Sequence, residues 1–480
     1  MMKHKIISSL LYQFAERLLV KGLGLIISII LARLLSPTEF GQVALMMVFV
    51  NVSIVFVDSG LNSAIVQNKD TSEGDYSTVF YLSLLVAFAL IAVLYFTAPF
   101  IADYYNDLGL VKPLRVYSIS LLFGVVKSIT QAKLQREMRF KQMMWSNLLA
   151  CVLSGIIGVL MAYMGHGIWA LISYYLSSQI ITTILYLIVT RWYPKLYFSY
   201  IRAKVLFSFG WRMSFSSLLC SMYYDIRSLI IGKVYSPAQL GYYNRGEQFP
   251  LIVSQTIDGA IQAVMFPVMS SVQETTFRVK EVLQRTFSIG ALIVVPIMFA
   301  MAIMSEDIIE CLLTSKWLPA VPYMQCICVG CATIPLTSSC LVAIKSLGRS
   351  DVYLRLEIFR RAVMMIILVV SVFCFESVLA IAVGFSLSSW VDYIIISIVI
   401  HRLLDYHVGE QLRDVWKPFV ASGLMCLVLY CITWFNIHAI WILLLQFVAG
   451  ISVYVLLCYA LKIHSYNYLI KQLQIIVRSK

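Results

Sequence analysis

Leu31-Ala-Arg-Leu-Leu-Ser-Pro-Thr-Glu-Phe-Gly41 closes one apolar segment and opens the next. Proline restricts the residue before it and cannot continue a helix, so the Ser-Pro pair predicts a tight turn between two helices. The stretch has an echo in Ile231-Gly-Lys-Val-Tyr-Ser-Pro-Ala-Gln-Leu-Gly241, where the serine, proline and glycine recur 200 positions later. At the same offset, Ser28, Phe49 and Asp58 recur as Ser228, Phe249 and Asp258. The register holds without a gap through two helices and a turn, which indicates an internal duplication with a period of about half the chain.

The composition is that of a membrane protein. Hydrophobic residues make up 60% of the chain and charged residues 13%, against about 25% charged residues in an ordinary soluble domain. The apolar residues form runs of about 20 separated by short polar loops, as membrane-spanning helices do. The strands of a β-barrel would alternate over about 10 residues, so a barrel is excluded. The predicted fold is all-α, an integral membrane protein with about 14 transmembrane helices.

The boundaries of these spans follow from the apolar runs. We predict spans at 8–34, 39–64, 77–100, 114–134, 143–164, 168–190, 205–234, 239–266, 286–304, 320–345, 357–375, 378–401, 415–435 and 438–461. The connections are too short for a soluble domain, and the longest, 193–204 and 401–416, are expected to form short amphipathic helices on the inner surface.

The charges predict an orientation. The connections after the fourth, sixth, eighth and tenth spans are basic, whereas odd-numbered connections are neutral or acidic, as at Ser305-Glu-Asp307. Lysine and arginine collect in cytoplasmic loops, so both termini are expected in the cytoplasm. The same bias explains the formal net charge of +13, and nucleic acid is not an expected partner.

The duplication predicts the domain organisation. Spans one and seven correspond, and so do spans two and eight, which gives the two halves the same orientation. We expect a six-helix bundle over 1–200, its parallel repeat over 201–405, and two further helices with a tail over 406–480. In transporters built from parallel repeats, the site lies between the repeats.

Charged residues inside the predicted spans mark the candidate site. A charge at the bilayer centre costs about 2.5–3.5 kcal/mol on insertion scales, so it usually faces a cavity or a partner. A basic, hydrated cleft suits an anionic, hydroxyl-rich ligand, because arginine binds phosphate bidentately and lysine binds it as a point charge. The expected substrate contacts are Arg17, Lys21, Arg212, Arg227 and Arg245. The candidate ion-coupling carboxylates are Glu16, Asp225, Glu247 and Asp258. Sugar-binding ring faces are expected from Tyr223, Tyr224, Tyr242 and Tyr243.

Structural explanations of the same residues stay open. In this interpretation Glu16, Arg17 and Lys21 lie near the inner surface and Arg212 lies near the start of its span, where long side chains reach the membrane surface. Asp225 with Arg227, and Arg245 with Glu247, form local ion pairs in this interpretation. Asp58 and Asp258 lie near cytoplasmic helix ends, where a carboxylate caps backbone groups or pairs with a loop lysine.

Catalytic and metal chemistry have little support in the sequence. It contains no phosphate-binding glycine loop, nucleophile elbow or helical histidine pair, so we expect no catalytic residue and no cofactor. Cys326-Ile-Cys-Val-Gly-Cys331 lacks a second ligand pair and lies in a predicted membrane helix, and the histidines form no pair at ligand spacing, so no metal site is expected. The eleven cysteines lie within or beside apolar runs and are expected to act as small hydrophobic residues.

Three stretches resemble one known family: 31–41, Asp58-Ser-Gly-Leu-Asn-Ser-Ala-Ile-Val-Gln67 and Gln131-Ala-Lys-Leu-Gln-Arg-Glu-Met-Arg-Phe140. They are similar to bacterial polysaccharide transporters, the Wzx-type oligosaccharide flippases of the multidrug/oligosaccharidyl-lipid/polysaccharide (MOP) exporter superfamily, in the branch with the colanic-acid and teichuronic-acid exporters. The resemblance implies two six-helix bundles around a central cavity, with two further helices. It also implies a bacterial cytoplasmic-membrane protein that translocates an undecaprenyl-pyrophosphate-linked oligosaccharide by alternating access for exopolysaccharide, capsule or lipopolysaccharide synthesis.

Two other functions remain as alternatives. One is a drug/cation antiporter on the same fold, which would need an apolar cavity with a deep carboxylate and fits the basic excess poorly. The other is a membrane polysaccharide polymerase or glycosyltransferase. For a flippase, the expected partners are the lipid-linked oligosaccharide and the bilayer, with H+ or Na+ and the polymerase machinery as further candidates.

Overall fold

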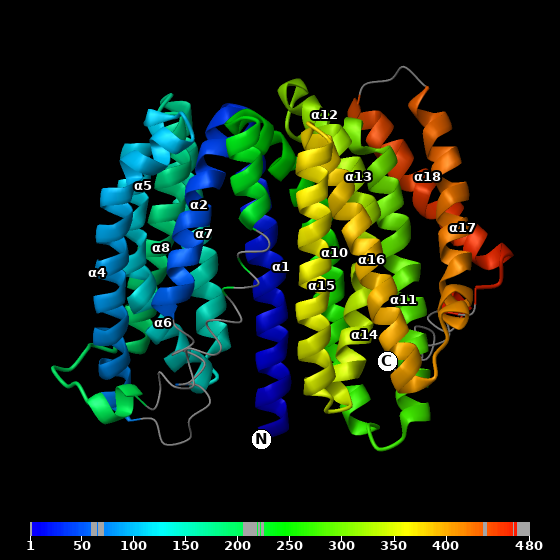
Figure 1. The fold of residues 1–480 in the computed structure, drawn as a ribbon, viewed down its shortest axis with the longest axis horizontal. Coiled ribbons are helices and arrows are strands. Elements are labelled where there is room, and N and C mark those ends of the chain that lie inside the picture. The colour runs from blue at the N-terminus through cyan, green and yellow to red at the C-terminus, as the bar shows by residue number, and fades with distance from the viewer. Residues whose placement is uncertain are drawn as a thin grey trace. The chain divides into compact units, whose positions relative to one another are not determined.

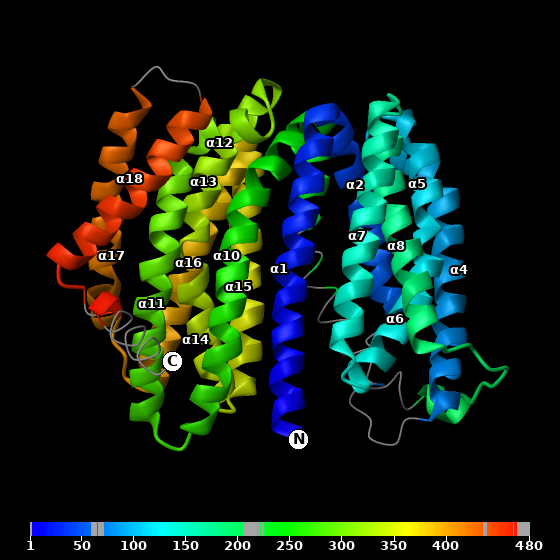
Figure 2. The same ribbon diagram turned by 180° about the vertical axis from the view of Figure 1, so that it is seen from behind.

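The computed structural model describes residues 2–58, 65, 72–204, 218, 221, 225–434, 439–463 and 465–467. The chain divides into two compact units, Met1–Gly241 and Tyr242–Lys480, and both consist of long helices (Figures 1 and 2). We describe each unit by itself. The expected repeat boundary near residue 200 stays a prediction.

The first unit is built mainly from helices that run the length of the bundle. Its helices are α1 (Met2–Leu34), α2 (Pro37–Asp58), α4 (Glu73–Tyr104), the 3-10 helix η1 (Leu108–Leu110), α5 (Val111–Ser118), α6 (Ser120–Arg136), α7 (Phe140–Tyr163) and α8 (Ile168–Thr190). α7 packs against both α1 and α8.

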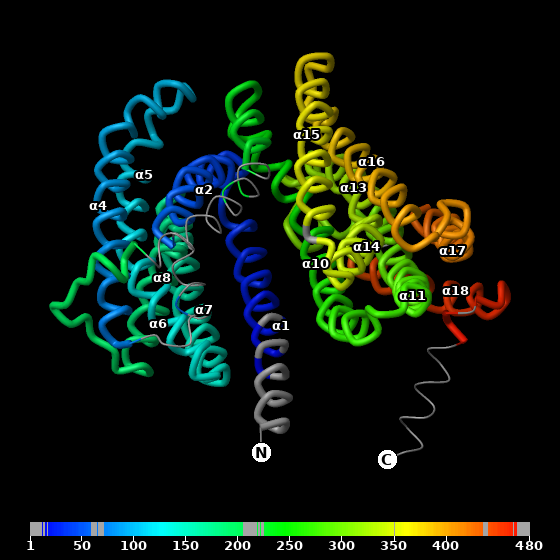
Figure 3. Tube along the Cα trace, turned by 60° about the horizontal axis from the view of Figure 1, so that its bottom comes forward, coloured from blue at the N-terminus to red at the C-terminus, as the bar shows by residue number. Residues whose placement is uncertain are grey.

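The second unit repeats this pattern and extends it. Its helices are α10 (Pro237–Ser271), whose first turn belongs to the first unit, α11 (Thr276–Ile303), α12 (Ser305–Leu312), the 3-10 helix η2 (Ser315–Ala320), α13 (Val321–Cys331), α14 (Ile334–Ser346), α15 (Ser350–Cys374), α16 (Val378–Leu404), α17 (Val408–Thr433) and α18 (Ala439–Ala460). α11 contacts α17, which in turn contacts α18 (Figure 3). In its core the Phe287 ring lies 5.9 Å from that of Tyr393 and 6.2 Å from that of Tyr406.

The all-helical membrane fold is confirmed. In the described part of the chain, 11 helical stretches are long and apolar enough to cross a membrane. Two further helices, α1 with 33 residues and α15 with 25, lie at the first and eleventh predicted spans. Most of the predicted seventh span, 205–234, lies outside the described residues, so the count of fourteen stays a prediction.

The fourth and tenth predicted spans are each broken in two, which the apolar runs did not indicate. α5 gives way to α6 after Ser118, and α13 gives way to α14 around Thr333. The Ser118 hydroxyl donates to the carbonyl of Arg115 at 2.7 Å, and the Thr333 hydroxyl donates to that of Gly330 at 2.9 Å. A side chain that bonds the carbonyl one turn back competes with the helix ladder and bends the helix. The same device therefore acts in both halves.

The connector after α8 folds back onto the start of α4. The backbone N–H of Lys195 donates to the Ser77 hydroxyl at 3.0 Å, and Arg202 forms a 3.1 Å ion pair with the buried carboxylate of Asp75. Trp192, 2% exposed, lies against Phe80. Within the described residues the expected helix over 193–204 begins only at residue 200. The separate helix expected over 401–416 is wrong, because α16 runs to Leu404 and α17 begins at Val408.

The two Ser-Pro turns contact each other inside the first unit. A Cβ added at Gly41 would lie far closer than 3.0 Å to the Pro237 carbonyl oxygen, and one added at Gly241 would clash in the same way with the Pro37 carbonyl oxygen. Backbone meets backbone on both sides, so no rotamer change can relieve either clash. The duplicated glycines are therefore required by close approach of two helix starts.

We predict that Gly41→Ala and Gly241→Ala each destabilise the protein by about 1–3 kcal/mol, the usual cost of overpacking. Gly124→Ala in α6 is the matched control, because a Cβ there meets no atom within 4 Å. Thermal unfolding in detergent measures the effect. A midpoint for Gly41→Ala equal to that of Gly124→Ala would show that the turns do not meet.

Candidate functional site

The predicted substrate cations fall into different environments. Lys21 is exposed on α1, whereas Arg227 and Arg245 are 5% and 6% exposed. The Arg17 side chain and the whole of Arg212 lie outside the described residues. Among the predicted contacts whose side chains the structure describes, Lys21 is therefore the exposed one.

Arg227 belongs to a short helical stretch that packs within the first unit. Gly232 there leaves room for the Leu45 side chain of α2, and the Tyr105 hydroxyl donates to the Leu229 carbonyl at 3.4 Å. Asp225, half-buried, lies within electrostatic range of Arg227. This arrangement supports the local-pair explanation. Contact of Arg227 with a ligand stays a proposal.

Arg245 lies in an aromatic environment in the second unit. Its guanidinium is 5.7 Å from the ring centroid of Trp317 and donates to the Gln248 side chain. Tyr242 meets the Trp317 ring edge-on, at 6.0 Å between centroids. Tyr243 is 1% exposed, so its ring face is not open to a sugar. A cation over a tryptophan face gains roughly 0.5–2 kcal/mol, which holds this guanidinium in place.

The duplicated aspartates occupy equivalent places. The Ser128 hydroxyl of α6 donates to Asp58 at 2.6 Å, and the Ser338 hydroxyl of α14 donates to Asp258. Asp258 also accepts from Gln262 at 2.6 Å. Each aspartate thus binds the fourth predicted helix of its own half. This geometry supports a structural role, while a coupling role for Asp258 stays a proposal.

A second polar network crosses the first unit. The Asn147 side chain donates to Glu16 at 2.6 Å and accepts from the Tyr186 hydroxyl at 3.0 Å. It links α1, α7 and α8. Lys127 on α6 donates to the Gln179 side chain on α8 at 3.0 Å. Glu16, a candidate coupling carboxylate, is therefore hydrogen-bonded to a neutral amide.

Sequence analysis missed a buried ion-pair network in the second unit. Arg360 on α15 donates through Nε and Nη2 to the two carboxylate oxygens of Asp392 on α16, and it lies 2.9 Å from Glu357. Glu357 also pairs with Arg361 at 2.8 Å. Arg360 and Asp392 are 4% and 5% exposed. Arg360 is one of the basic residues that follow the tenth predicted span, but Asp392 inside the apolar run 378–401 is a usable signal for a buried partner.

The described residues of the second unit enclose an apolar and a polar cavity. An apolar cavity of about 650 Å³ lies among α11, α12, α17 and α18, and it includes the fully buried side chain of Gln446. A polar cavity of about 640 Å³ lies among α11, α17 and the residues after α18. Beside it, burial and the neighbouring Asp414 raise the pKa of Tyr406, whose hydroxyl donates to that carboxylate at 2.6 Å.

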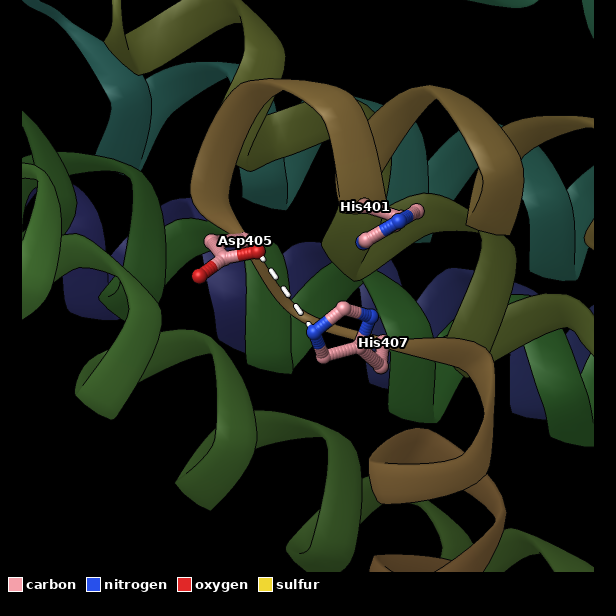
Figure 4. A group of neighbouring side chains, drawn as sticks. All are labelled: His401, Asp405 and His407. Atoms are coloured by element: carbon pink, nitrogen blue, oxygen red, sulfur yellow. Dashed lines mark ion pairs between the residues drawn. The ribbon is translucent and has the colours of Figure 1, made fainter.

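A group of side chains of the kinds that bind metals lies at the turn from α16 to α17 (Figure 4). Ligand atoms of His401, Asp405 and His407 lie within 4.8 Å of one another, and Nε2 of His407 is 3.5 Å from the Asp405 carboxylate. The two imidazoles stack with centroids 4.2 Å apart and planes tilted by 40°. Metals bind in the ring plane, so stacked rings do not direct their lone pairs to a common point. The geometry favours a histidine stack paired with aspartate when His407 is protonated.

Comparison with known proteins decides the family. A family described as polysaccharide biosynthesis protein matches residues 30–322, more than half of the chain. This protein is a member of that family. The resemblance seen in the three sequence stretches is confirmed, and the chain is a multi-pass membrane protein of a bacterial exporter family.

Relatives of this family member come from several bacteria. The succinoglycan biosynthesis transport protein ExoT of Rhizobium meliloti (strain 1021) is 25% identical, over 69% of this chain and 67% of its own. The teichuronic acid biosynthesis protein TuaB of Bacillus subtilis (strain 168) is 24% identical over 78% of each chain. The lipopolysaccharide biosynthesis protein WzxC of Escherichia coli (strain K12) is 20% identical over 88% of this chain and 86% of its own. These relatives support the expectation that the family member is not an enzyme.

Solved structures show the fold. The lipid II flippase MurJ in an inward closed conformation matches 97% of this chain and all of its own, with a TM-score of 0.80 and 16% identity. An inward-facing MATE transporter of the MOP superfamily matches 81% of this chain and 95% of its own, with a TM-score of 0.59 and 15% identity. The family member thus has the fold of this superfamily.

We predict that Arg360→Gln or Asp392→Asn destabilises the family member by about 3–5 kcal/mol, because each leaves a buried charge without its partner. The double variant Arg360→Met/Asp392→Leu should recover most of this loss. Thermal unfolding of the purified proteins provides the measurement.

The exposed pair Arg349–Asp351 supplies the control. Its side chains are 52% and 57% exposed, and Arg349→Gln should change stability by about 0–1 kcal/mol. The backbone N–H of Val352 and, less strongly, Arg349 lower the pKa of Asp351, so this carboxyl stays charged at neutral pH. Equal losses for Arg360→Gln and Arg349→Gln would contradict the buried network.

Proposed function

We propose that this protein is a flippase that translocates an undecaprenyl-pyrophosphate-linked oligosaccharide across the bacterial cytoplasmic membrane, supplying repeat units for a surface polysaccharide. The observation that carries the proposal is family membership over residues 30–322 together with a MurJ-like fold over 97% of the chain. ExoT is named a succinoglycan biosynthesis transport protein, and MurJ, whose fold this chain shares, is named a lipid II flippase.

The charges inside the membrane helices support the proposed substrate chemistry. A pyrophosphate is recognised by arginine and lysine, and this chain carries Lys21, Arg227 and Arg245 within its predicted spans. We propose Arg17 and Arg212 as further contacts from their sequence positions alone. The buried arginines would reach the substrate only in a conformation in which local partners such as Asp225 and Gln248 give way.

The apolar cavity fits a different part of the same substrate. Its lining is apolar apart from the Gln446 side chain and the Tyr454 hydroxyl, which donates to the Leu292 carbonyl at 2.9 Å. The cavity is formed by helices that lie after the predicted repeat or pack against it. Sugars and phosphates would lose their hydration there without gaining hydrogen bonds. We propose that it receives the prenyl chain, while the sugars follow the polar, cationic path.

Several features of the cycle remain within the proposal. Both termini lie in the cytoplasm, as the basic loops predict. Alternating access exposes the glycan first inside and then outside. Proton or sodium movement drives the cycle, with Glu16, Asp225, Glu247 and Asp258 as the candidate carboxylates. The polymerase machinery is a proposed partner that takes up the translocated unit.

We predict that deletion of the gene causes lipid-linked repeat units to accumulate on the inner face of the membrane. Protection of these units from a membrane-impermeant glycosidase added outside the cell measures the sidedness. Unpolymerised units outside would instead indicate a polymerase. Unchanged polysaccharide with raised drug sensitivity would indicate the antiporter, whose fold this chain shares.

We predict that Lys21→Gln slows translocation about tenfold or more, because a hydrogen bond to a charged phosphate is worth roughly 1.5–3 kcal/mol. Lys21→Arg should retain the activity, since it keeps the charge. Lys21 is exposed, so neither change removes packing. Flipping of a fluorescent pyrophosphoryl lipid in proteoliposomes is the measurement.

Lys141→Gln, at the exposed start of α7, is the matched control for the loss of one positive charge. It should leave the rate within twofold of the wild type. A rate unchanged in Lys21→Gln, or an equal loss in both variants, would remove Lys21 from the substrate path.

A further inference from the structure

The polar cavity of the second unit has walls of two kinds. Arg285 of α11 and Arg413 and Lys417 of α17 supply three cations, while Ile289 and Pro418 supply an apolar wall. The lining also contains two carboxylates, Glu281 and Asp414, so its formal charge is +3 − 2 = +1. A volume of about 640 Å³ accommodates a small polar headgroup with part of an attached apolar chain.

The two carboxylates already have donors of their own. Glu281 accepts from Arg285 at 2.5 Å, and Asp414 accepts from the Tyr406 hydroxyl at 2.6 Å. Both therefore repel an anion less than free carboxylates would. Lys417 uses one of its three N–H groups on the Leu461 carbonyl, at 3.0 Å, which leaves two donors for a ligand. Arg413 is exposed and adds a planar donor group at the rim.

The cavity also lies at the level of a membrane surface. Its residues come from the first turns of α17 and from the part of α11 that precedes its most apolar run, at the end that the basic residues Arg278, Lys280 and Arg285 predict to be cytoplasmic. Trp416 is 48% exposed beside it, and tryptophan favours the interface between headgroups and hydrocarbon. A basic pocket between membrane helices on the cytoplasmic side suits an anionic lipid headgroup.

We propose that this cavity binds the phosphate headgroup of an anionic glycerophospholipid of the inner leaflet. The cations hold the phosphate, the Ile289 and Pro418 wall receives the glycerol end of the acyl chains, and Trp416 lies at the headgroup boundary. The bound lipid links α11, α17 and the segment after α18, because the cavity is closed by Ile463 and Ser465. This proposal does not depend on the proposed function.

Native mass spectrometry of the delipidated full chain tests the proposal. Phosphatidylglycerol, phosphatidylcholine and inorganic phosphate serve as probes. The wild type should retain phosphatidylglycerol at least tenfold more tightly than phosphatidylcholine. One basic residue near an anionic lipid contributes about fivefold in affinity, so Arg413→Gln should weaken phosphatidylglycerol binding roughly fivefold, and Arg413→Gln/Lys417→Gln roughly 25-fold.

Arg355→Gln/Arg402→Gln is the matched control, since it removes two exposed cations elsewhere in the same unit. It should stay within twofold of the wild type. Equal binding of phosphatidylcholine, an equal loss in the control, or inorganic phosphate that binds as tightly as phosphatidylglycerol would each overturn the proposal. If the double variant fails to fold, the single variant Arg413→Gln still tests the proposal, because the exposed Arg413 side chain contributes little packing. Translocation is measured separately, so either proposal can fail alone.

Discussion

A charge inside a membrane helix needs an ion-pair or hydrogen-bond partner within the protein, and this requirement determines helix contacts in both units. Water is absent from the hydrocarbon region, so an unmet carboxylate or guanidinium would cost several kcal/mol. Asp58 and Asp258 are met by serines, Glu16 by Asn147, and Arg360 by Asp392. Each partner lies on a different helix, so the same contacts that neutralise or solvate the charge also fix which helices lie together.

The local partners change how the intramembrane charges are interpreted. From sequence alone, each charge was a candidate for ligand contact or ion coupling. The structure gives many of them a neighbour, and among the predicted substrate contacts whose side chains it describes Lys21 is the exposed one. A transporter that alternates between states can use a partnered charge only by exchanging partners. The local pairs then stabilise the substrate-free state, and a substrate phosphate has to compete with them.

The sequence was sufficient for the helical membrane fold, because the length of an apolar run is dictated by bilayer thickness. Helix ends such as those of α1 and α8 agree with the predicted spans. Helix starts were less well predicted, as at α11, because helices continue past the hydrocarbon into polar residues that the apolar pattern does not mark. The breaks at Ser118 and Thr333 coincide with hydroxyl-to-carbonyl hydrogen bonds, which composition cannot reveal. The Arg360–Asp392 pair was missed because its partners are 32 positions apart and lie on different helices.

The halves also share features that leave no identical residues. Met138 and Gly348 both take positive φ angles, 55° and 71°, at the turn after the helix that carries the aspartate-binding serine. A methionine and a glycine at the same bend show that the backbone path was kept while the side chain changed. The backbone geometry therefore shows the similarity of the two halves over a longer stretch than identical residues do.

The contact between the two Ser-Pro turns explains why the serine, proline and glycine are still identical in both turns. After a gene duplicates, its copies are free to drift apart wherever they do not touch each other. Gly41 and Gly241 do not have that freedom, because each turn faces the main chain of the other copy. A side chain added in one turn clashes with the other turn. A second substitution cannot remove the clash, because the atom that is met is a backbone carbonyl oxygen. The two Ser-Pro turns are therefore identical in the residues where each faces the main chain of the other.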